Sequence, residues 1–451
     1  MDESTGQTAP IRRARPAAVR QRAKLAETVA RAIERDILDG GWAVGAVFGG
    51  EAELMERYQT SRSVIREAIR LVEYHQIAVP RRGRGGGLIV SAPVEKSVVE
   101  AIVLFLEVVG VSLKEITDAR LVLERLAIRQ AVDRLDETGI AQLRASTRAE
   151  ATAGICGADQ QLHQVIVEIA NNAVVRIYLD SLVALTRRHP WVVQSVRRDR
   201  AGAAKLPKVH QAIADAIISG DVGLAQQRMT EHLGAITKAV ESPATPPAKT
   251  AGPRPTPALV VRPQFDDPAL SAILADVRAH AGEPGVHLGS EPELMERYGV
   301  SRAKLRESVR ILEHLGVAEM RRGTSGGLVI TEPEPDGVAT TVAMYLEYYK
   351  ASATDLQEAR VALELYTVGE VVEHLDDQSV ERLLEVQRIE RRAGDDLVTA
   401  VDDGTYALSL ASRFHLRLAD LSGNRAVQVF ARPLIALTSG RRRAEIGRAH
   451  V

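Results

Sequence analysis

The chain has 451 residues, which at roughly 150 residues per domain suggests about three domains, with two or four also compatible. Hydrophobic residues make up 45% and charged residues 26%, a composition typical of globular rather than disordered protein. The 58 Lys+Arg and 59 Asp+Glu leave a formal net charge of −1, so no overall basic field points to a nucleic-acid partner.

The sequence also bears on the cellular compartment. The single cysteine, Cys156, excludes an internal disulfide framework and a cysteine-rich zinc module, and it fits a reducing environment. No run of 18 apolar residues is present to span a membrane, and the N-terminal stretch lacks the apolar segment of a secretory signal. We therefore expect a cytoplasmic protein without a membrane partner.

The first expected elements form a winged helix-turn-helix domain over residues 24–93. Apolar residues at helical spacing predict a first helix that stops at Gly40, and Ser61 is the expected N-cap of the third helix. A glycine-rich turn joins two short strands that follow. The expected elements are helices over residues 25–40, 49–58 and 61–75 and strands over residues 77–81 and 87–91.

The remainder of the chain repeats this organisation. After residue 93, amphipathic segments of 12 to 20 residues predict an all-α bundle. Residues 51–90 and 291–330 then align without a gap at an offset of 240, with 20 of 40 positions identical. The chain is therefore interpreted as a duplicated two-domain protein of mainly α class. Its expected parts are a disordered arm (residues 1–23), winged helices (24–93 and 266–333), helical domains (94–240 and 334–444, the second incomplete) and a Pro-rich linker (241–265).

Candidate DNA-binding residues gather on the third helix and the hairpin. Arg62, Ser63 and Arg66 occupy the N-terminal turns of that helix, where a recognition helix meets base edges and phosphates. Basic and small residues share the hairpin turn, and residues 1–94 carry a local net charge of +4, from 15 Lys+Arg and 11 Asp+Glu. A solvated helix face and a phosphate-binding nucleotide loop are the alternatives. The hairpin candidates are Arg82, Gly83 and Arg84.

Recurrence of Ser-Arg-x-x-x-Arg-Glu and Arg-Arg-Gly-x-x-Gly-Gly in both copies favours the DNA-binding interpretation. The segment from Glu53 to Val90 resembles the DNA-binding domain of GntR-type bacterial transcription regulators. The helical half resembles the FCD effector domain of the FadR-like subgroup. This resemblance implies major-groove contacts by Arg62 and Arg66 and a wing contact by Arg82. In the second copy the corresponding candidates are Arg302, Lys304, Arg306, Arg322 and Gly323.

The chain departs from the family pattern before its second helix. The usual Leu-Pro-Ser-Glu is Phe48-Gly49-Gly50-Glu51 in the first copy, so we expect a weaker helix start there. Where many relatives have an arginine, the two copies have Ala52 and Pro292, which removes one expected DNA contact.

A metal site is expected in the first helical domain. Asp159 and His163 are four residues apart and share a helix face, and His210 and His232 fall on two later helices. Three imidazoles and a carboxylate suit a divalent transition metal such as zinc, although spacing alone is also compatible with ordinary surface or core histidines. The resemblance implies a metal at these four positions, with an open coordination site for a small organic acid. Arg120 could assist the effector or simply form an ion pair with Glu124.

The second copy lacks parts of this site. His415 takes the place of His163 after a 12-residue insertion, with Ala411 where a carboxylate is expected. Helices equivalent to those of His210 and His232 are not completed before residue 451, so one metal ion per chain is expected. Residues 445–451, EIGRAHV, also match what a common sequencing-adapter sequence encodes, and we treat them as a candidate non-native tail.

The sequence thus predicts a metabolite-responsive transcription regulator rather than an enzyme. It is expected to bind an imperfect palindromic operator in double-stranded DNA, as an intramolecular pseudo-dimer or a homodimer, in the cytoplasm and on the nucleoid. One alternative is a metal-dependent enzyme built on the Asp-His-His-His cluster, which lacks a plausible general base. Another is a structural DNA-bridging protein with degenerate effector domains.

Overall fold

The computed structural model describes residues 17–81, 83, 86–153, 161–188, 205–241, 268–280, 283–321, 326–393 and 410–449. Two compact units result, residues 1–92 and the chain from residue 93 onward apart from residues 403–405, and each unit is described by itself. Most of the expected arm and linker lies outside the described residues. Helix α1 begins at Ala17, however, so the expectation of a disordered arm up to residue 23 is wrong from residue 17 on.

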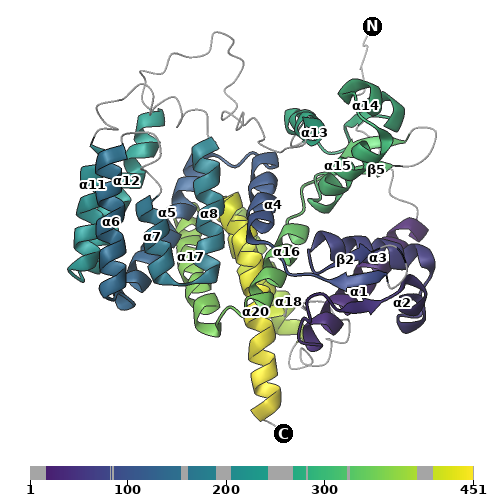
Figure 1. Cartoon of the computed structure of the whole chain (residues 1–451), viewed down its shortest axis with the longest axis horizontal. Helices are drawn as coiled ribbons and strands as arrows, with labels where there is room; N and C mark the ends of the chain where they lie inside the picture. Colours follow the sequence, from purple (N-terminus) through teal and green to yellow (C-terminus); the bar gives the residue numbers. More distant parts are fainter. Residues whose placement is uncertain are drawn as a thin grey trace. The chain divides into compact units, whose positions relative to one another are not determined.

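The first unit is a winged helix-turn-helix. Its third helix packs against the first, and a three-stranded antiparallel sheet of order β1-β3-β2 forms the wing (Figure 1). The two strands expected from the sequence are confirmed, and a third of three residues, β1, was not predicted. The elements are α1 (Ala17–Asp39), β1 (Val47–Gly49), α2 (Glu51–Arg57), α3 (Arg62–Tyr74), β2 (Ala78–Arg81) and β3 (Gly87–Val90).

Local chemistry explains where these elements begin. Although Gly50 has no side chain to cap α2, its backbone N–H donates to the Glu53 carboxylate at 3.3 Å. Ser61 is the N-cap of α3 as expected, yet its hydroxyl lies 3.1 Å from that of Ser63 instead of bonding the helix backbone. At the start of β3, a Cβ on Gly87 would lie 2.8 Å from the carbonyl oxygen of Gly49, so only glycine lets the strands approach this closely.

The second unit begins, in chain order, with a helical domain and continues with a second winged helix. The described helices of the first helical domain pack around a common aliphatic core (Figure 1). They are α4 (Glu95–Val108), α5 (Leu113–Asp133), α6 (Glu137–Ala153), α7 (Gln161–Ala170), α8 (Ala173–Arg188), α11 (Leu206–Ile218) and α12 (Val222–Glu241).

The second winged helix and second helical domain repeat the first pair in element order. The sheet order β4-β6-β5 matches that of the first wing. The winged helix comprises α13 (Pro268–Ala279), β4 (His287–Gly289), α14 (Glu291–Tyr298), α15 (Arg302–His314), β5 (Ala318–Arg321) and β6 (Gly327–Ile330). The helical domain comprises α16 (Asp336–Tyr348), α17 (Ala353–Glu373), α18 (Asp377–Ala393), α19 (Leu410–Leu421) and α20 (Arg425–Ala449).

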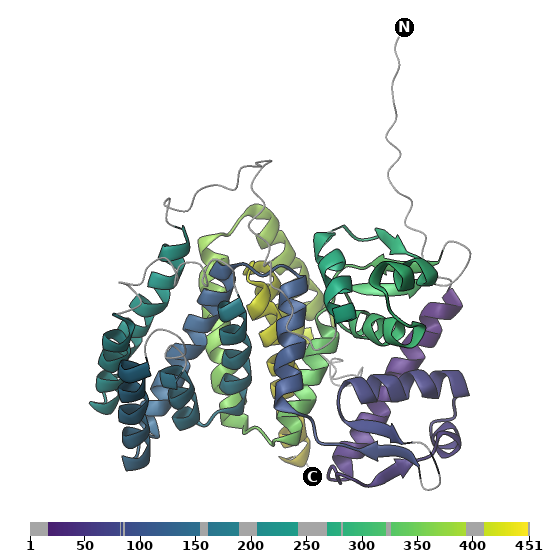
Figure 2. The ribbon, with the colours of Figure 1, turned by 45° about the horizontal axis from the view of Figure 1, so that its top comes forward.

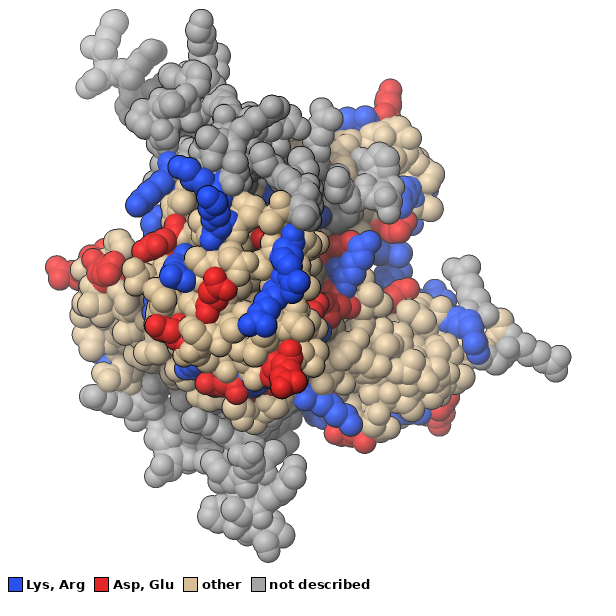
Figure 3. Space-filling model, turned by 60° about the vertical axis from the view of Figure 1, so that its left-hand side comes forward, with Lys and Arg blue, Asp and Glu red and all other residues tan. Residues whose placement is uncertain are grey.

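The described part of the second helical domain therefore ends with α20, the equivalent of α8. Among the residues that the structure describes, no helix after α20 corresponds to α11 or α12. Helix α20 runs through Pro433 to Ala449, so no structural boundary falls at residue 444. None of the described helices is both long enough and apolar enough to cross a bilayer. Basic and acidic side chains are interspersed over the face seen in Figure 3.

The two helical domains pack against each other within the second unit. Helix α4 packs on α16 and α5 packs on α17, and the blue and lime-green helices lie side by side in Figures 1 and 2. Tyr178 of α8 stacks on Phe430 of α20, with ring centroids 4.0 Å apart and 9° between the planes. These two residues hold equivalent positions in the two copies, as expected at the axis of a two-fold arrangement.

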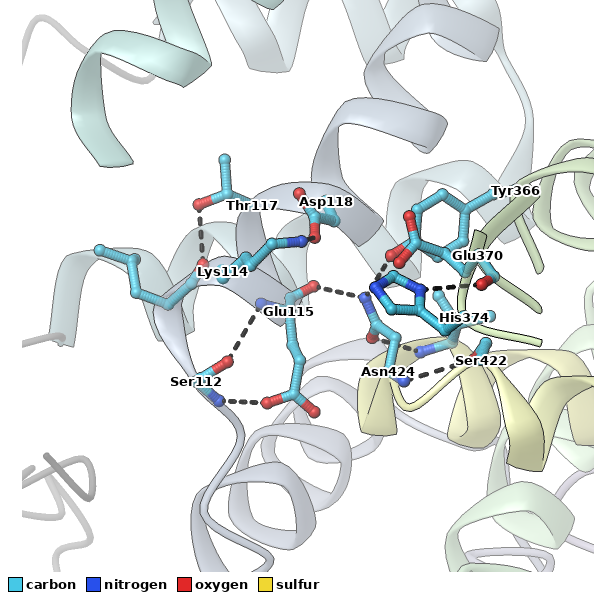
Figure 4. Close-up of polar contacts among 12 residues, drawn as sticks. Ser112, Lys114, Glu115, Thr117, Asp118, Tyr366, Glu370, His374, Ser422 and Asn424 are labelled. Atoms are coloured by element: carbon cyan, nitrogen blue, oxygen red, sulfur yellow. Dashed lines mark hydrogen bonds and ion pairs between the residues drawn. The ribbon is translucent and has the colours of Figure 1, made fainter. Parts of the chain in front are cut away.

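A second pair of equivalent residues crosses the same interface in both directions. Asn172 and Asn424 accept hydrogen bonds from the backbone at the starts of α8 and α20. The amide of Asn424 donates to the carbonyl oxygen of Glu115 at 3.0 Å (Figure 4), and that of Asn172 donates to the carbonyl oxygen of Asp355 at 3.4 Å. Glu115 and Asp355 are themselves equivalent, so the contact is reciprocal, as in a symmetric dimer.

Candidate DNA-binding helices and metal centre

The arginines expected to read DNA lie on the exposed start of α3. The side chains of Arg62 and Arg66 are 69% and 59% exposed, and a separation of four residues places them on one helix face. Their Nε atoms lie 3.0 Å and 2.9 Å from the two carboxylate oxygens of Glu51, at the start of α2. Glu51, which the sequence did not single out, thus holds both guanidinium groups beside each other.

The second copy repeats this arrangement. The Nε atoms of Arg302 and Arg306 lie 3.6 Å and 2.7 Å from Oε1 of Glu291, the equivalent of Glu51. The hydrogen bond from Arg306 lowers the pKa of the Glu291 carboxyl group. Helices α3 and α15 therefore each present an exposed arginine pair held by one glutamate, although the two arginines meet different carboxylate oxygens in the first copy and the same oxygen in the second.

The residues between the arginines differ in a way that the sequence described only in part. Val64 is 3% exposed and belongs to the core, so it offers nothing to DNA at the surface. Its equivalent, Lys304, reaches the surface, where its Nζ lies 3.1 Å from Oε2 of Glu307. Ser63 is half-buried and Ala303 is exposed.

The wing candidates are only partly described. Gly83 has a φ of +103°, a conformation that favours glycine, in the turn between β2 and β3. The remaining wing candidates lie outside the described residues and stay predictions; these are Arg82, Arg84, Arg322 and Gly323.

Three predicted metal ligands come together in the core of the first helical domain. His163 of α7, His210 of α11 and His232 of α12 are buried, and their ligand atoms lie within 4.8 Å of one another. Nε2 of His163 lies 3.3 Å from Nε2 of His232. Two nitrogens bound tetrahedrally to one zinc ion at about 2.0–2.1 Å are separated by about 3.3 Å, so these ring positions fit a shared ion. The fourth expected ligand, Asp159, lies outside the described residues.

Two buried glutamates orient the imidazoles. Nδ1 of His163 lies 2.7 Å from Oε1 of Glu124, and Nδ1 of His210 lies 2.7 Å from Oε2 of Glu150. A carboxylate on the far ring nitrogen is the usual support for a metal-binding histidine, because it fixes the tautomer and raises the basicity of the ligand nitrogen. Glu150 also accepts the backbone N–H of Leu162 at 3.2 Å. No sequence pattern indicated Glu150, and Glu124 was predicted only as an ion-pair partner of Arg120.

The electrostatics of the cluster favour a neutral imidazole at His232 and an ionised carboxylate at Glu124. Burial lowers the pKa of His232 well below its usual range, and the neighbouring His163, His210 and Arg120 lower it further. Burial alone would raise the pKa of Glu124, but the positive charges and hydrogen bonds of His163 and Arg120 outweigh it and bring the pKa to about 2. Neutral imidazoles next to ionised carboxylates are the protonation states that a transition metal requires.

Arg120 is buried beside the cluster. Its Nε lies 3.1 Å from Oε1 of Glu124, and its side chain is 4% exposed. This is the ion-pair alternative that the sequence left open. Arg120 does not line the cavity that adjoins the histidines, so the expected contact with an effector stays a prediction.

A cavity of about 210 Å³ adjoins the cluster between α5, α7 and α8, and Glu124 and His163 form part of its wall. Arg187 and Gln164 supply further polar groups. Burial, with the nearby carboxylates of Glu95 and Glu168, raises the pKa of Asp180 in this wall to about 6. The cavity thus brings basic, neutral and acidic polar groups next to the histidine cluster.

The second copy preserves only the inner part of the site. His415, Glu364 and Arg360 repeat the arrangement of His163, Glu124 and Arg120, with Nδ1 of His415 3.1 Å from Oε1 of Glu364. The side chain of His415 is 33% exposed, whereas that of His163 is 3% exposed. Ala411 lies within α19, and the described residues bring no second or third histidine to this place.

Comparison with known proteins agrees with these features. Residues 25–87 match the family of bacterial regulatory proteins called gntR, and residues 115–235 and 355–450 each match the FCD domain. The matched segments together cover more than half of the chain. The second winged helix is recognised by its sequence similarity to the first, with 20 of 40 aligned positions identical, and by its element order.

Individual relatives are transcriptional regulators. Over 136 residues, 30% of the chain, it is 34% identical to the HTH-type transcriptional regulator RmpR of Mycobacterium gastri, and this stretch spans 46% of RmpR. It is 27% identical over 215 residues to the HTH-type transcriptional regulator YcbG of Bacillus subtilis, 47% of this chain and 88% of YcbG.

Among solved structures, Streptococcus agalactiae GntR is 19% identical with a TM-score of 0.30, covering 47% of this chain and 99% of that one. The McbR/YncC protein of E. coli is 16% identical with a TM-score of 0.25, covering 48% and 96%. The domain matches and the curated regulators together show that the chain belongs to the GntR family of bacterial DNA-binding transcription regulators and carries the FCD domain twice.

Proposed function

We propose that this regulator changes its affinity for DNA when a divalent metal, zinc, and a small organic acid bind in the first FCD domain. The observation that carries the proposal is the buried cluster of His163, His210 and His232, which adjoins a cavity with polar walls. A metal-dependent enzyme remains the less favoured alternative, since it does not account for the two winged helices.

The three histidines would hold the metal, with Asp159 as the predicted fourth protein ligand. Bound zinc supplies a Lewis-acidic position that accepts a carboxylate oxygen of the effector. Glu124 and Glu150 keep two of the rings in the ligand orientation. Removal of either glutamate should therefore weaken the site without removing a ligand.

The polar groups in the cavity wall suit an effector that carries a carboxylate. Arg187 provides a positive charge and Gln164 an amide donor. Asp180 would repel a carboxylate when ionised, but its pKa of about 6 means that much of it is protonated in mildly acidic solution. Protonation turns Asp180 into a hydrogen-bond donor, so binding of a carboxylate should strengthen as the pH falls toward 6.

We infer that one chain supplies both DNA-binding heads of a functional unit. Family members typically dimerise, and the reciprocal contacts of Tyr178 with Phe430 and of the two asparagines support an internal pseudo-dimer. The operator would then be an imperfect palindrome, because Ser63 of the first head is replaced by Ala303 at the equivalent position of the second head. The proposed place of action is the nucleoid.

The experiment that tests this function is selection of bound sequences from a random DNA pool, with zinc present and after chelation. The proposal predicts one selected motif whose affinity changes when zinc is removed and again when small dicarboxylates are added. His163→Ala should abolish both responses, while His415→Ala serves as the matched control. Equal binding under all conditions would contradict the proposed control by metal and effector.

A further inference from the structure

In the first winged helix, one carboxylate holds two exposed arginines. Nε of Arg62 lies 3.0 Å from Oε1 of Glu51, and Nε of Arg66 donates to Oε2 of the same residue at 2.9 Å. Glu51 is the first residue of α2, directly after its N-cap, so the start of a helix carries the carboxylate. Exposed ion pairs contribute little to folding stability. The consequence of this arrangement is therefore the position of the two guanidinium groups.

In the second winged helix, the equivalent carboxylate serves mainly one arginine. Arg306 donates to both oxygens of Glu291, from Nε to Oε1 at 2.7 Å and from Nη2 to Oε2 at 3.3 Å. Nε of Arg302 lies 3.6 Å from Oε1, which is beyond hydrogen-bond distance. The first of the two recognition arginines is thus held in one head and loosely placed in the other.

This difference matters because an arginine has two hydrogen-bonding edges, one through Nε and one through its two Nη groups. The two Nη groups match N7 and O6 of guanine in the major groove. A carboxylate on the Nε side therefore leaves the guanine-binding edge available and orders the side chain before DNA arrives. An ordered side chain loses less conformational entropy on binding. A loosely placed arginine can instead turn to another base or to a phosphate, so it discriminates less.

The same carboxylate also affects binding to every sequence. Phosphate groups attract arginine and lysine and repel carboxylates, and this electrostatic contribution supplies most of the non-specific affinity. A glutamate between two recognition arginines therefore lowers non-specific binding while it raises discrimination in favour of guanine.

We propose that Glu51 and Glu291 are specificity-determining residues, which set how strictly each head reads its half-site. Glu51 positions both arginines of the first head, so this head reads two guanines strictly. Glu291 positions only Arg306, so the second head reads one guanine strictly and tolerates other bases at the place of Arg302. The proposal rests on the proposed reading of DNA by these arginines, and it is independent of metal and effector.

The test uses the full chain and begins with selection of bound duplexes from a random pool. Repeating the selection with each arginine replaced in turn assigns every selected guanine to the arginine that reads it. Fluorescence anisotropy then measures the loss of affinity when each assigned guanine is replaced by adenine. We expect about tenfold or more at the three strictly read positions, and less than about threefold at the place of Arg302. The four assigning variants are Arg62→Ala, Arg66→Ala, Arg302→Ala and Arg306→Ala.

The glutamates are tested by removal of their charge. Glu51→Gln should reduce the preference for guanine at both positions of the first half-site, and Glu291→Gln only at the position of Arg306. Both variants should bind a duplex of unrelated sequence more tightly, because a negative charge near the phosphates is lost. An unfolded variant would instead lose affinity for both duplexes, so the opposite directions separate specificity from folding.

Glu67→Gln is the matched control. It removes an exposed carboxylate of α3 that pairs with Arg70 at 2.8 Å and contacts neither recognition arginine in the described ion pairs. This variant should bind the unrelated duplex more tightly but keep the preference for guanine.

The possible failures can be told apart. An unchanged preference for guanine in Glu51→Gln, in a chain whose arginine variants do weaken operator binding, would overturn this proposal alone. So would equal losses at the positions of Arg62 and Arg302. Arginine variants that bind the operator as the unaltered chain does would overturn both this proposal and the proposed reading of DNA. All measurements share one fixed zinc concentration without effector, so a failure of control by metal or effector leaves these outcomes unaffected.

Discussion

The rings of Tyr178 and Phe430 lie face to face although 252 positions separate them in the chain. They occupy equivalent places in the two FCD domains, and the Tyr178 hydroxyl donates to the carbonyl oxygen of Phe430 at 2.9 Å. Self-contact of equivalent residues is the signature of a two-fold interface between identical subunits. Here the two partners belong to one chain, so the interface forms without a second molecule.

Removal of the Tyr178 ring should strongly lower the free energy of unfolding. Tyr178→Ala removes a fully buried aromatic side chain, a change that typically costs about 3–5 kcal/mol of unfolding free energy. Tyr178→Phe keeps the stack and loses only the hydrogen bond, for about 1 kcal/mol. Urea unfolding followed by circular dichroism measures both values. A loss for Tyr178→Ala no larger than that for Tyr178→Phe would show that the interface contributes little.

Metal content provides a second prediction. Purified protein should carry about one zinc ion per chain, which His163→Ala or His210→Ala removes, because a metal site that lacks one protein ligand loses much of its binding energy. His415→Ala is the matched control and should retain the ion. Elemental analysis by mass spectrometry gives the ratio. A ratio near two would mean that the second FCD domain holds a metal on its own.

The supporting carboxylate should matter without being a ligand. Glu150→Gln preserves the shape of the side chain but weakens the acceptor that faces Nδ1 of His210, so zinc affinity should fall by about 10–100-fold. Competition with a fluorescent zinc chelator measures this affinity. Glu168→Gln, a carboxylate on α7 outside the cluster, is the control. Equal zinc affinity in the two variants would show that Glu150 does not support zinc binding.

The metal-free protein should lose stability in mild acid. Burial and the adjacent rings hold the pKa of His232 well below 6.5, whereas the unfolded chain binds a proton near pH 6.5. Since the unfolded state takes up this proton first, stability is complete above about pH 6.5 and declines as the pH falls below it. The urea midpoints of the metal-free chain at pH 8 and pH 5.5 test the direction of this change in stability. His232→Leu, which has no titrating ring, should show a smaller difference, and a higher midpoint at pH 5.5 would contradict the argument.

The two heads should prefer related but unequal half-sites. The outer arginines are shared, but Ala303 and Lys304 differ from Ser63 and Val64, and a base pair read differently contributes about 1–3 kcal/mol. Replacement of Ala303-Lys304 by Ser-Val should shift the selected sequences toward a symmetric site. Because Val64 is buried, most of this shift should come from loss of the lysine and gain of the serine hydroxyl. Operators that are already symmetric at each contacted position would contradict the prediction.

The winged helices could be predicted from the sequence because their signals are local. Helical spacing, Ser61 and the glycine-rich turn identify elements within a few residues of one another. Strand β1 was missed because three residues carry too little periodicity. The start of α2 was expected to be weak, yet Glu53 compensates through the backbone N–H of Gly50.

For the metal centre, the sequence predicted the histidine ligands but not the residues that support them. Histidines are conspicuous in a sequence, whereas Glu150 reaches His210 from a helix 60 positions earlier and gives no pattern of its own. The pairing of Asn172 with Asp355 likewise depends on how two domains pack, which neither segment encodes locally. Tertiary contacts between distant helices are what the sequence alone did not supply.

The most direct test of the central claim is the mass of the complex between the chain and its minimal operator, measured by light scattering coupled to size-exclusion chromatography. One chain carries two heads, so the account predicts a complex of one chain with one operator in which both half-sites are protected from cleavage. A complex with two chains, and therefore four heads, on the minimal operator would contradict the internal pseudo-dimer.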